Sequence, residues 1–398
     1  MSSIYRNCHF TVAATHARDG EGELFHSTPD FKVSGEAPDG QSYKLYFREA
    51  MDHHIEVVHG GSDVDWGQNS FPLLSRAWVY QERMLSTRVI HFGRLEMFFE
   101  CRSGIWCECS RIADDFQSGS TSRAVVKNEF AAILDSSNQS DMSGQYSCAT
   151  LWRTVVSSYS VLRLTRTSDR LPAIGGLARV MGAQRKARYL AGLWEDSLND
   201  DLIYTIFNPL PKPYSRDAPT WSWASVNSDT AYLSELEAPA LDSPNTLWPR
   251  LPYTHFSKVE QCEVLPAAVD EFEQLSHGFL TISGLVAEGH FGVRMEANIF
   301  NGKKEANYYA VFAHLRQAIY PDYLPEDMKS GTPVLCLRMS TIQYGTEEFL
   351  VSLVLKESTT FPGCFERIGS MRIQSHPPPV DPLGGIYEEA SLGTVTIF

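Results

Sequence analysis

The chain has 398 residues with 43% hydrophobic and 12% aromatic content, which is typical of a globular protein with more than one core and excludes a disordered chain. Its formal net charge of -14 argues against a dedicated nucleic-acid binder, because contacts with phosphates require clustered Lys and Arg. Eight scattered cysteines, no long apolar run and no secretory signal pattern predict a reduced, cytoplasmic protein without a membrane span.

The first region, residues 1–115, mixes short strand-like runs with one helix, which is typical of an α/β or α+β domain. Strand-like runs lie at 10–14, 43–48 and 55–59. Positions 74, 78, 81 and 85 fall on one helical face, so Gln81 needs a hydrogen-bonding partner if that face is buried. Residues 88–93 and 96–102 then alternate like two strands around a tight turn at Gly93 and Arg94.

Residues 116–145 are polar and predict a surface connection, apart from the apolar run 125–134. Residues 146–235 predict a helical region, in which Leu151, Val155 and Tyr159 repeat at helical spacing. A second helix there is expected to begin at Pro172, with Ser168 or Asp169 as its N-cap. The pair Gly175-Gly176 within it indicates the close approach of another element, either for packing or for ligand access.

Residues 250–398 predict a β-rich region, because the runs 279–286, 334–339, 349–355 and 364–373 are strand-like with Gly and Pro at their margins. The run 308–314 fits either a strand or a helix. No segment repeats at a fixed period, which argues against a propeller or solenoid. The expected fold class is therefore α+β: a partial α/β domain at 1–115, a helical middle region, and a C-terminal antiparallel β-rich domain.

Four segments resemble, in the expected order, signatures of one protein family. The most specific is Trp-Val-Tyr-Gln-Glu-Arg-Met-Leu-Ser-x-Arg-Val-Ile-His-Phe-Gly at 78–93, continued by Phe99-Glu100-Cys101 and Trp106-Cys107-Glu108. The others are Ile-Tyr-Arg-Asn-Cys with Thr-Val-Ala-Ala at 4–14, Leu-Thr-Arg-Thr-Ser-Asp-Arg-Leu-Pro-Ala-Ile at 164–174, and Ala-Pro-Thr-Trp-Ser-Trp-Ala-Ser at 218–225. Together they resemble the fungal heterokaryon-incompatibility (HET) domain and the region that follows it.

The match begins in the second half of the HET domain. The Ser-Tyr-x-Trp-Gly and Trp-x-Asp-x-x-Cys-Ile-x-Gln elements of the family's first half do not occur here. The resemblance therefore implies either an N-terminally truncated member or an incomplete sequence of a longer protein. It implies a role in heterokaryon incompatibility, non-self recognition and programmed cell death, or in derived signalling, through protein contacts. A missing half-domain leaves sheet edges and apolar surface uncovered, which predicts self-association or a protein partner. A further hypothesis is that the chain is a degenerate member of the family that has no remaining activity.

An alternative function is a small-molecule enzyme of fungal secondary metabolism, of the cyclase or isomerase type. Ligand pockets are typically lined by aromatic side chains with a few polar groups. Under this hypothesis Glu82 and His91 are the catalytic candidates. Ligand or partner binding is assigned to the residues of the two signatures richest in aromatic and charged groups: Trp78, Tyr80, Gln81, Glu82, Arg83, Trp221 and Trp223.

Cys101, Cys107 and Cys109 with His91 form a candidate zinc site, because thiolates and imidazole are zinc ligands. The spacing C-x5-C-x-C does not match the usual C-x2-C knuckles, so we expect no metal and no cofactor. A second candidate of weak metal or proton-transfer potential is the histidine-rich patch of His53, His54 and His59 with Asp52 and Asp63. The common nucleophile-elbow, P-loop, zincin and dinucleotide motifs do not occur.

Overall fold

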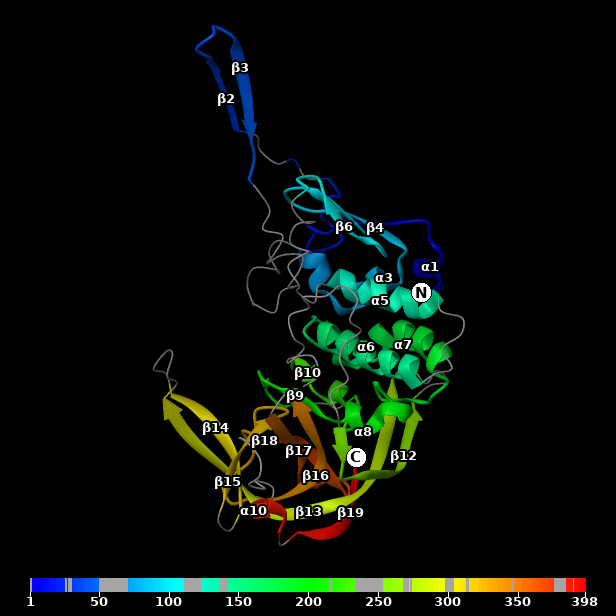
Figure 1. The fold of residues 1–398 in the computed structure, drawn as a ribbon, viewed down its shortest axis with the longest axis vertical. Helices are drawn as coiled ribbons and strands as arrows, with labels where there is room; N and C mark the ends of the chain where they lie inside the picture. The colour runs from blue at the N-terminus through cyan, green and yellow to red at the C-terminus, as the bar shows by residue number, and fades with distance from the viewer. Residues whose placement is uncertain are drawn as a thin grey trace. The chain divides into compact units, whose positions relative to one another are not determined.

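The computed structural model describes residues 2–25, 27, 31–49, 71–110, 123–135, 142–214, 217–232, 253–267, 272, 274–297, 304–312, 315–344, 347–375, 384–388 and 390–398 (Figure 1). The described residues form two compact units. Unit 1 holds those from 2 to 135 together with Leu162–Leu164, and unit 2 holds the others.

Unit 1 is built around a four-stranded sheet of order β1-β4-β5-β6, formed by Thr11–Ala13, Arg88–Phe92, Met97–Cys101 and Gly104–Cys107. Strand β1 runs parallel to β4, and the β4–β5 and β5–β6 pairs are antiparallel. The predicted strands at 88–93 and 96–102 are confirmed, with Phe92 opposite Met97 across the turn. Strand β6 was not predicted.

Two helices of unit 1, α3 (Ala77–Leu85) and α5 (Arg123–Asp135), lie beside this sheet (Figure 1). Helix α3 follows a 3-10 turn, η2 (Pro72–Ser75), and ends at Ser86, whose hydroxyl donates to the carbonyl of Glu82 at 2.7 Å. The predicted helical face of α3 is buried at Gln81 and Leu85, but Tyr80 and Met84 are buried as well. Helix α5 lies within the predicted polar connection and buries Val126, Lys127, Phe130 and Ala131.

A separate two-stranded antiparallel hairpin in unit 1 is formed by β2 (Phe31–Glu36) and β3 (Ser42–Phe47) (Figure 1). The register pairs Phe31 with Phe47 and Val33 with Leu45. Because side chains alternate between the two faces of a strand, these pairs and Gly35–Tyr43 share one face. The opposite face carries Lys32, Ser34, Glu36, Ser42, Lys44 and Tyr46.

The helical part of unit 2 consists mainly of α6 (Met142–Ser160) and α7 (Pro172–Arg185), which lie side by side (Figure 1). Pro172 occupies the first turn of α7 as predicted, but Leu171 is the N-cap residue and makes no side-chain capping bond. The prediction of Ser168 or Asp169 as N-cap is wrong, because these residues lie in the preceding 3-10 turn η3 (Thr167–Asp169). A Cβ on Gly175 would come within 2.5 Å of the carbonyl oxygen of Phe272, so the close approach there serves packing.

Short elements follow α7 in unit 2, and they precede a nine-stranded sheet. They are β7 (Tyr189–Leu190), β8 (Leu193–Trp194), η4 (Glu195–Ser197), α8 (Leu198–Asp201), β9 (Tyr204–Ile206), η5 (Trp223–Ser225) and β10 (Thr230–Tyr232). The sheet comprises β11 (Tyr253–His255), β12 (Lys258–Pro266), β13 (Leu275–Ala297), β14 (Lys304–Val311), β15 (Arg316–Pro321), β16 (Pro333–Tyr344), β17 (Glu347–Glu357), β18 (Phe365–Ser375) and β19 (Ser391–Ile397). A one-turn helix, α10 (Gly384–Tyr387), precedes the last strand.

The large sheet closes on itself through its longest strand. Strand β13 pairs with β12 and β19 along its first half and with β14 and β16 along its second half. Strands β16, β17 and β18 pair in succession, and a single parallel pairing of Phe365 with Ile397 joins β18 to β19. The prediction of an antiparallel β-rich domain is confirmed, the run 308–314 is a strand as far as Val311, and the expected α+β class is observed.

Candidate functional site

The most unusual group of side chains in unit 1 is a completely buried set of charges around Glu100. The alternation of β4 turns Val89 and His91 inward, and that of β5 turns Phe98 and Glu100 inward, so His91 and Glu100 share the buried face of the sheet. Arg83 from α3 and Lys127 from α5 reach the same carboxylate. We call Arg83, His91, Glu100 and Lys127 the Glu100 cluster.

Three basic side chains of the Glu100 cluster converge on its one carboxylate. Arg83 donates its Nε–H to Oε2 of Glu100, Nε2 of His91 lies 3.2 Å from the same oxygen, and Nζ of Lys127 lies 3.4 Å from Oε1. On the other side of the ring, Oγ1 of Thr15 lies 3.0 Å from Nδ1 of His91. The imidazole also stacks on the ring of Phe98, with 4.2 Å between ring centroids.

Burial and charge act in opposite directions on this cluster. Burial alone raises the pKa of Glu100, but the cations Arg83 and Lys127 together with His91 hold that pKa well below its usual range. Burial lowers the pKa of His91 to about 4, against the opposing effect of Glu100. Burial also lowers the pKa of Lys127. At neutral pH the imidazole is therefore uncharged, and its Nε2–H donates to Glu100 while Nδ1 accepts from Thr15.

The two catalytic candidates from the sequence, Glu82 and His91, do not meet. His91 is 1% exposed and its ring nitrogens face Thr15 and Glu100. Glu82 is half-buried on α3 and is hydrogen-bonded by Tyr5. Burial raises the pKa of Glu82, and the hydrogen bond from Tyr5 and the charge of Arg76 moderate that increase. Glu82 and Arg83, which are adjacent in sequence, thus have different partners, and Arg83 is directed to the Glu100 cluster.

The remaining predicted binding residues lie mainly in the two cores. Tyr80 and Gln81 are buried in unit 1, and Trp78 is half-buried. Trp221 and Trp223 are completely buried in unit 2, where the indole N–H of Trp223 donates to the carbonyl of Gly192 at 3.0 Å. This burial favours a packing role over ligand stacking for both indoles. The histidine-rich patch and the predicted strand at 55–59 lie outside the described residues.

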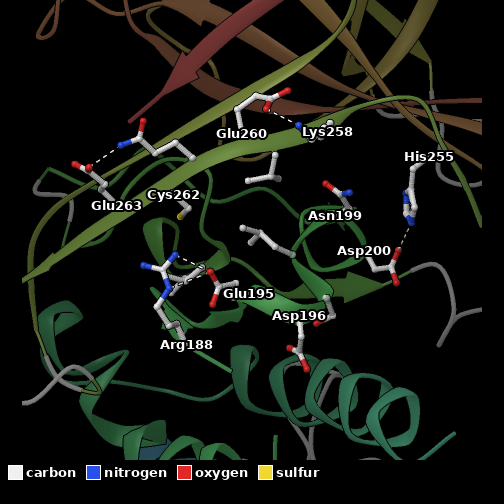
Figure 2. Close-up of a pocket in the computed structure, with 15 residues that line it drawn as sticks. Arg188, Glu195, Asp196, Asn199, Asp200, His255, Lys258, Glu260, Cys262 and Glu263 are labelled. Atoms are coloured by element: carbon white, nitrogen blue, oxygen red, sulfur yellow. Dashed lines mark hydrogen bonds and ion pairs between the residues drawn. The ribbon is translucent and has the colours of Figure 1, made fainter. Parts of the chain in front are cut away.

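Unit 2 contains an open pocket that the sequence did not indicate. Its cavity of about 640 Å³ lies between strand β12 and the segment from Arg188 to Asp200 (Figure 2). Figure 2 shows ion pairs in its lining: Arg188 Nη2 lies 2.7 Å from Oε1 of Glu195, and Lys258 Nζ lies 2.8 Å from Oε2 of Glu260. In addition, His255 Nε2 lies 3.1 Å from Oδ1 of Asp200. The other acidic residues of the lining are Asp196 and Glu263.

The lining of this pocket suits a small polar or cationic ligand better than an apolar one, because carboxylates predominate over cations. His255 is the candidate for proton transfer in this pocket, with Nδ1 held 2.7 Å from Oγ of Ser340 and Nε2 3.1 Å from Oδ1 of Asp200. Cys262, which also lines the pocket, is a poor nucleophile because burial raises its pKa to about 12.

The sequence did not indicate Thr15 and Glu100 as partners of His91, or Lys127 as a partner of Glu100. The sequence signal that could have found them is the alternation of β5, which places Glu100 on the same buried face as Phe98. A buried carboxylate needs nearby cations to offset its charge. Neither cation is close to Glu100 in sequence: Arg83 is 17 positions away, and Lys127 lies beyond the sheet in an apolar helical run.

Searches against protein-family models, curated proteins and solved structures found no match to this chain. No helix in the described part of the chain has the length and apolar character needed to cross a bilayer.

Proposed function

We propose that this chain is a HET-family protein of a filamentous fungus, acting in the cytoplasm in heterokaryon incompatibility or non-self recognition, or in signalling derived from it, through protein contacts. The four ordered sequence signatures support the family, and the observation that carries the contact role is the uncovered apolar face of the β2–β3 hairpin. Phe31 is 66% exposed and Phe47 53% exposed, although both are large apolar side chains that are normally buried.

The occupant of that face in this proposal is the hairpin of a second copy of the chain. An isolated two-stranded hairpin is marginally stable in water, and covering its apolar face makes it more stable. The face is self-complementary, because the three pairs Phe31–Phe47, Val33–Leu45 and Gly35–Tyr43 present one continuous apolar strip. The other face, with Lys32, Glu36 and Lys44, suits water.

The surface is tested by measuring the molar mass of the full chain over a range of concentrations by sedimentation velocity. The wild type is expected to form dimers, and Leu45→Glu to remain monomeric, because the new carboxylate would be buried without a partner. Lys44→Glu is the matched control, since it introduces the same residue one position away on the polar face, and it is expected to dimerise. A wild type that stays monomeric, or a Leu45→Glu variant that still dimerises, contradicts the assignment.

The biological role is tested separately by expressing the same three proteins in a filamentous fungus and scoring growth arrest and cell death. The proposal expects death with the wild type and Lys44→Glu, and survival with Leu45→Glu. If the wild type dimerises in vitro but causes no arrest in any strain pairing, the incompatibility role fails while the contact surface stands.

The pocket of unit 2 favours a second candidate, a small-molecule enzyme of the cyclase or isomerase type in fungal secondary metabolism. The side chain of His255 lines this pocket and is 35% exposed, whereas His91 is buried. Nε2 of His255 lies 3.1 Å from Asp200, and its Nδ1 lies 2.7 Å from Oγ of Ser340. Comparing the metabolites of a host expressing the wild type with those of one expressing His255→Gln tests it, with His277→Gln, outside the pocket lining, as the control. Identical metabolite profiles for all three proteins would exclude this function for the pocket.

A further inference from the structure

Three potential metal ligands of unit 1 lie close together, between the β4–β5 turn and the turn that follows β6. Glu96 lies at the β4–β5 turn, directly before β5, Cys107 is the last residue of β6, and Cys109 follows it in a turn. Antiparallel pairing sets Phe98 opposite Cys107, and the amide of Glu108 donates to the carbonyl of Met97 at 3.2 Å. The ladder therefore brings the residue after Glu108 next to the residue before Met97.

The donor atoms of these three residues all lie within 4.8 Å of one another. The two Sγ atoms of Cys107 and Cys109 are 3.3 Å apart, and Sγ of Cys109 is 3.4 Å from Oε1 of Glu96. With Zn–S bonds of about 2.3 Å and Zn–O bonds of about 2.1 Å, the edges of a zinc tetrahedron measure about 3.8 Å between sulfurs and about 3.6 Å between sulfur and oxygen. Small side-chain adjustments would thus accommodate an ion.

The carboxylate is held in place before any ion arrives. Glu96 is 7% exposed, and its Oε2 accepts the backbone N–H of Cys109 at 2.9 Å, which directs Oε1 toward the thiols. Cys107 packs against the apolar cluster of Phe71, Leu74, Leu95, Phe98 and Ile105, while Cys109 reaches solvent. The site therefore has a rigid, dry side and an open side through which an ion can enter.

We propose that Glu96, Cys107 and Cys109 form a site for a thiophilic divalent cation, with Zn²⁺ as the best fit. Two thiolates and one carboxylate leave a fourth tetrahedral position for water, and their three negative charges compensate the ion. This donor set differs from the one considered in the sequence, where Glu96 was not included. His91 is directed toward Thr15 and Glu100, and Sγ of Cys101 accepts the N–H of Ser103 at 3.2 Å.

The ion would join the β4–β5 turn to the segment that follows β6, and so stabilise this end of the unit 1 sheet. Binding to the folded state alone raises stability in proportion to the logarithm of the free ion concentration. Binding also requires deprotonated thiols, so it releases protons and weakens as the pH falls.

The test uses the reduced, chelator-stripped full chain, titrated with Zn²⁺ in competition with a chromophoric chelator and separately with Co²⁺. We expect one equivalent of metal and a thiolate-to-cobalt charge-transfer band. Cys107→Ser, Cys109→Ser and Glu96→Gln should each lower the affinity by about 100-fold or more, since even the loss of a group behind the ligands costs 10- to 100-fold. Glu96→Gln retains an acceptor for the Cys109 amide, so its folding is least at risk.

Cys101→Ser is the matched control, because it removes a neighbouring thiol from the same sheet, and it should bind as the wild type does. The proposal is overturned if the folded wild type takes up no zinc, if Cys101→Ser abolishes binding, or if Glu96→Gln binds zinc as tightly as the wild type. It is also overturned if Cys107 and Cys109 resist reduction, because mass spectrometry would then identify them as a disulfide.

Discussion

Trp223 donates its indole N–H to the backbone carbonyl of Gly192, with 3.0 Å between nitrogen and oxygen. The same oxygen accepts the indole N–H of Trp152 at 2.9 Å, so both of its lone pairs are used. Gly192 adopts a φ of +94°, and a Cβ there would come within 2.7 Å of the indole nitrogen of Trp223. The absence of a side chain at this position is therefore required by the core of unit 2.

Gly192→Ala is expected to destabilise unit 2 by several kcal/mol, because it combines the strain of a left-handed backbone, about 1–2 kcal/mol, with displacement of a buried indole. The measurement is the free energy of unfolding followed by tryptophan fluorescence. Gly331→Ala isolates the strain, since Gly331 has the same φ of +94° with nothing within 4 Å of its Cβ position. Equal losses for the two variants would show that the indole contact is unimportant.

Glu100→Gln is expected to destabilise unit 1 by about 3–5 kcal/mol, because it leaves the buried cations of Arg83 and Lys127 without their anion. Urea denaturation at neutral pH measures this. Glu49→Gln, which removes an exposed carboxylate 3.3 Å from Arg94, should cost no more than about 1 kcal/mol. A Glu100→Gln variant as stable as the wild type would mean that the cluster is not held by its charges.

His91 gives unit 1 a defined pH dependence. Its pKa falls from 6.5 to about 4 on folding, so between these values the unfolded chain binds a proton that the folded chain does not. Stability therefore rises with pH in this window, and lowering the pH from 7 to 5 should cost about 2 kcal/mol through this residue alone. Urea unfolding at both pH values checks it.

The His91→Gln variant supplies the control for that pH dependence. Its side chain does not titrate, so it should lose about 2 kcal/mol less than the wild type between pH 7 and pH 5. Glu100 also makes the folded state more stable as the pH rises, because folding lowers its pKa. That stabilisation is lost only below about pH 4.5, so it does not affect the comparison between pH 7 and pH 5. Parallel pH profiles for wild type and His91→Gln would contradict the assignment of a neutral, buried imidazole.

Arg367 fixes β18 against the short elements of unit 2. Its guanidinium donates to the carbonyls of Leu202 at 2.7 Å and Tyr204 at 2.8 Å, and Nε lies 2.9 Å from Oδ2 of Asp322. Arg367→Lys should cost about 3 kcal/mol or more, because the single nitrogen of a lysine cannot reach three acceptors that are spread around the planar guanidinium. Arg294→Lys, at an exposed arginine, should change the unfolding free energy by less than about 0.5 kcal/mol. Similar losses of unfolding free energy for the two variants would contradict this role of Arg367.

The sequence predicted elements well where local chemistry determines them. The alternation of 88–93 and 96–102 with Gly93 between them specified the β4–β5 hairpin, and Pro172 specified the start of α7. Strand β6 was missed because four residues, Gly104–Cys107, carry too short a pattern. The capping role given to Ser168 or Asp169 was wrong because the chain makes a 3-10 turn before Pro172.

The candidate sites were harder to predict, because they depend on contacts between distant residues. His91 was selected for its chemistry, but its environment is set by Thr15, 76 positions away, and by Glu100. The role of Glu96 depends on the register of β5 against β6, which sequence spacing does not reveal. The pocket of unit 2 likewise combines Arg188 to Asp200 with β12, two segments separated by more than 50 positions.

Strand β13 has a consequence for how unit 2 opens. At Val286 the strand pairs with Leu337 of β16 on one side and with Ser391 of β19 on the other. Both neighbouring strands come later in the chain than β13. Fluctuations that detach β19 or β16 alone leave the other partner in place. Each amide around Val286 donates to only one of these two strands, so its exchange with deuterium reports the detachment of that strand. Comparing the exchange rates of the amides that face β16 with those that face β19 therefore shows whether the two strands open separately or only when the whole unit unfolds.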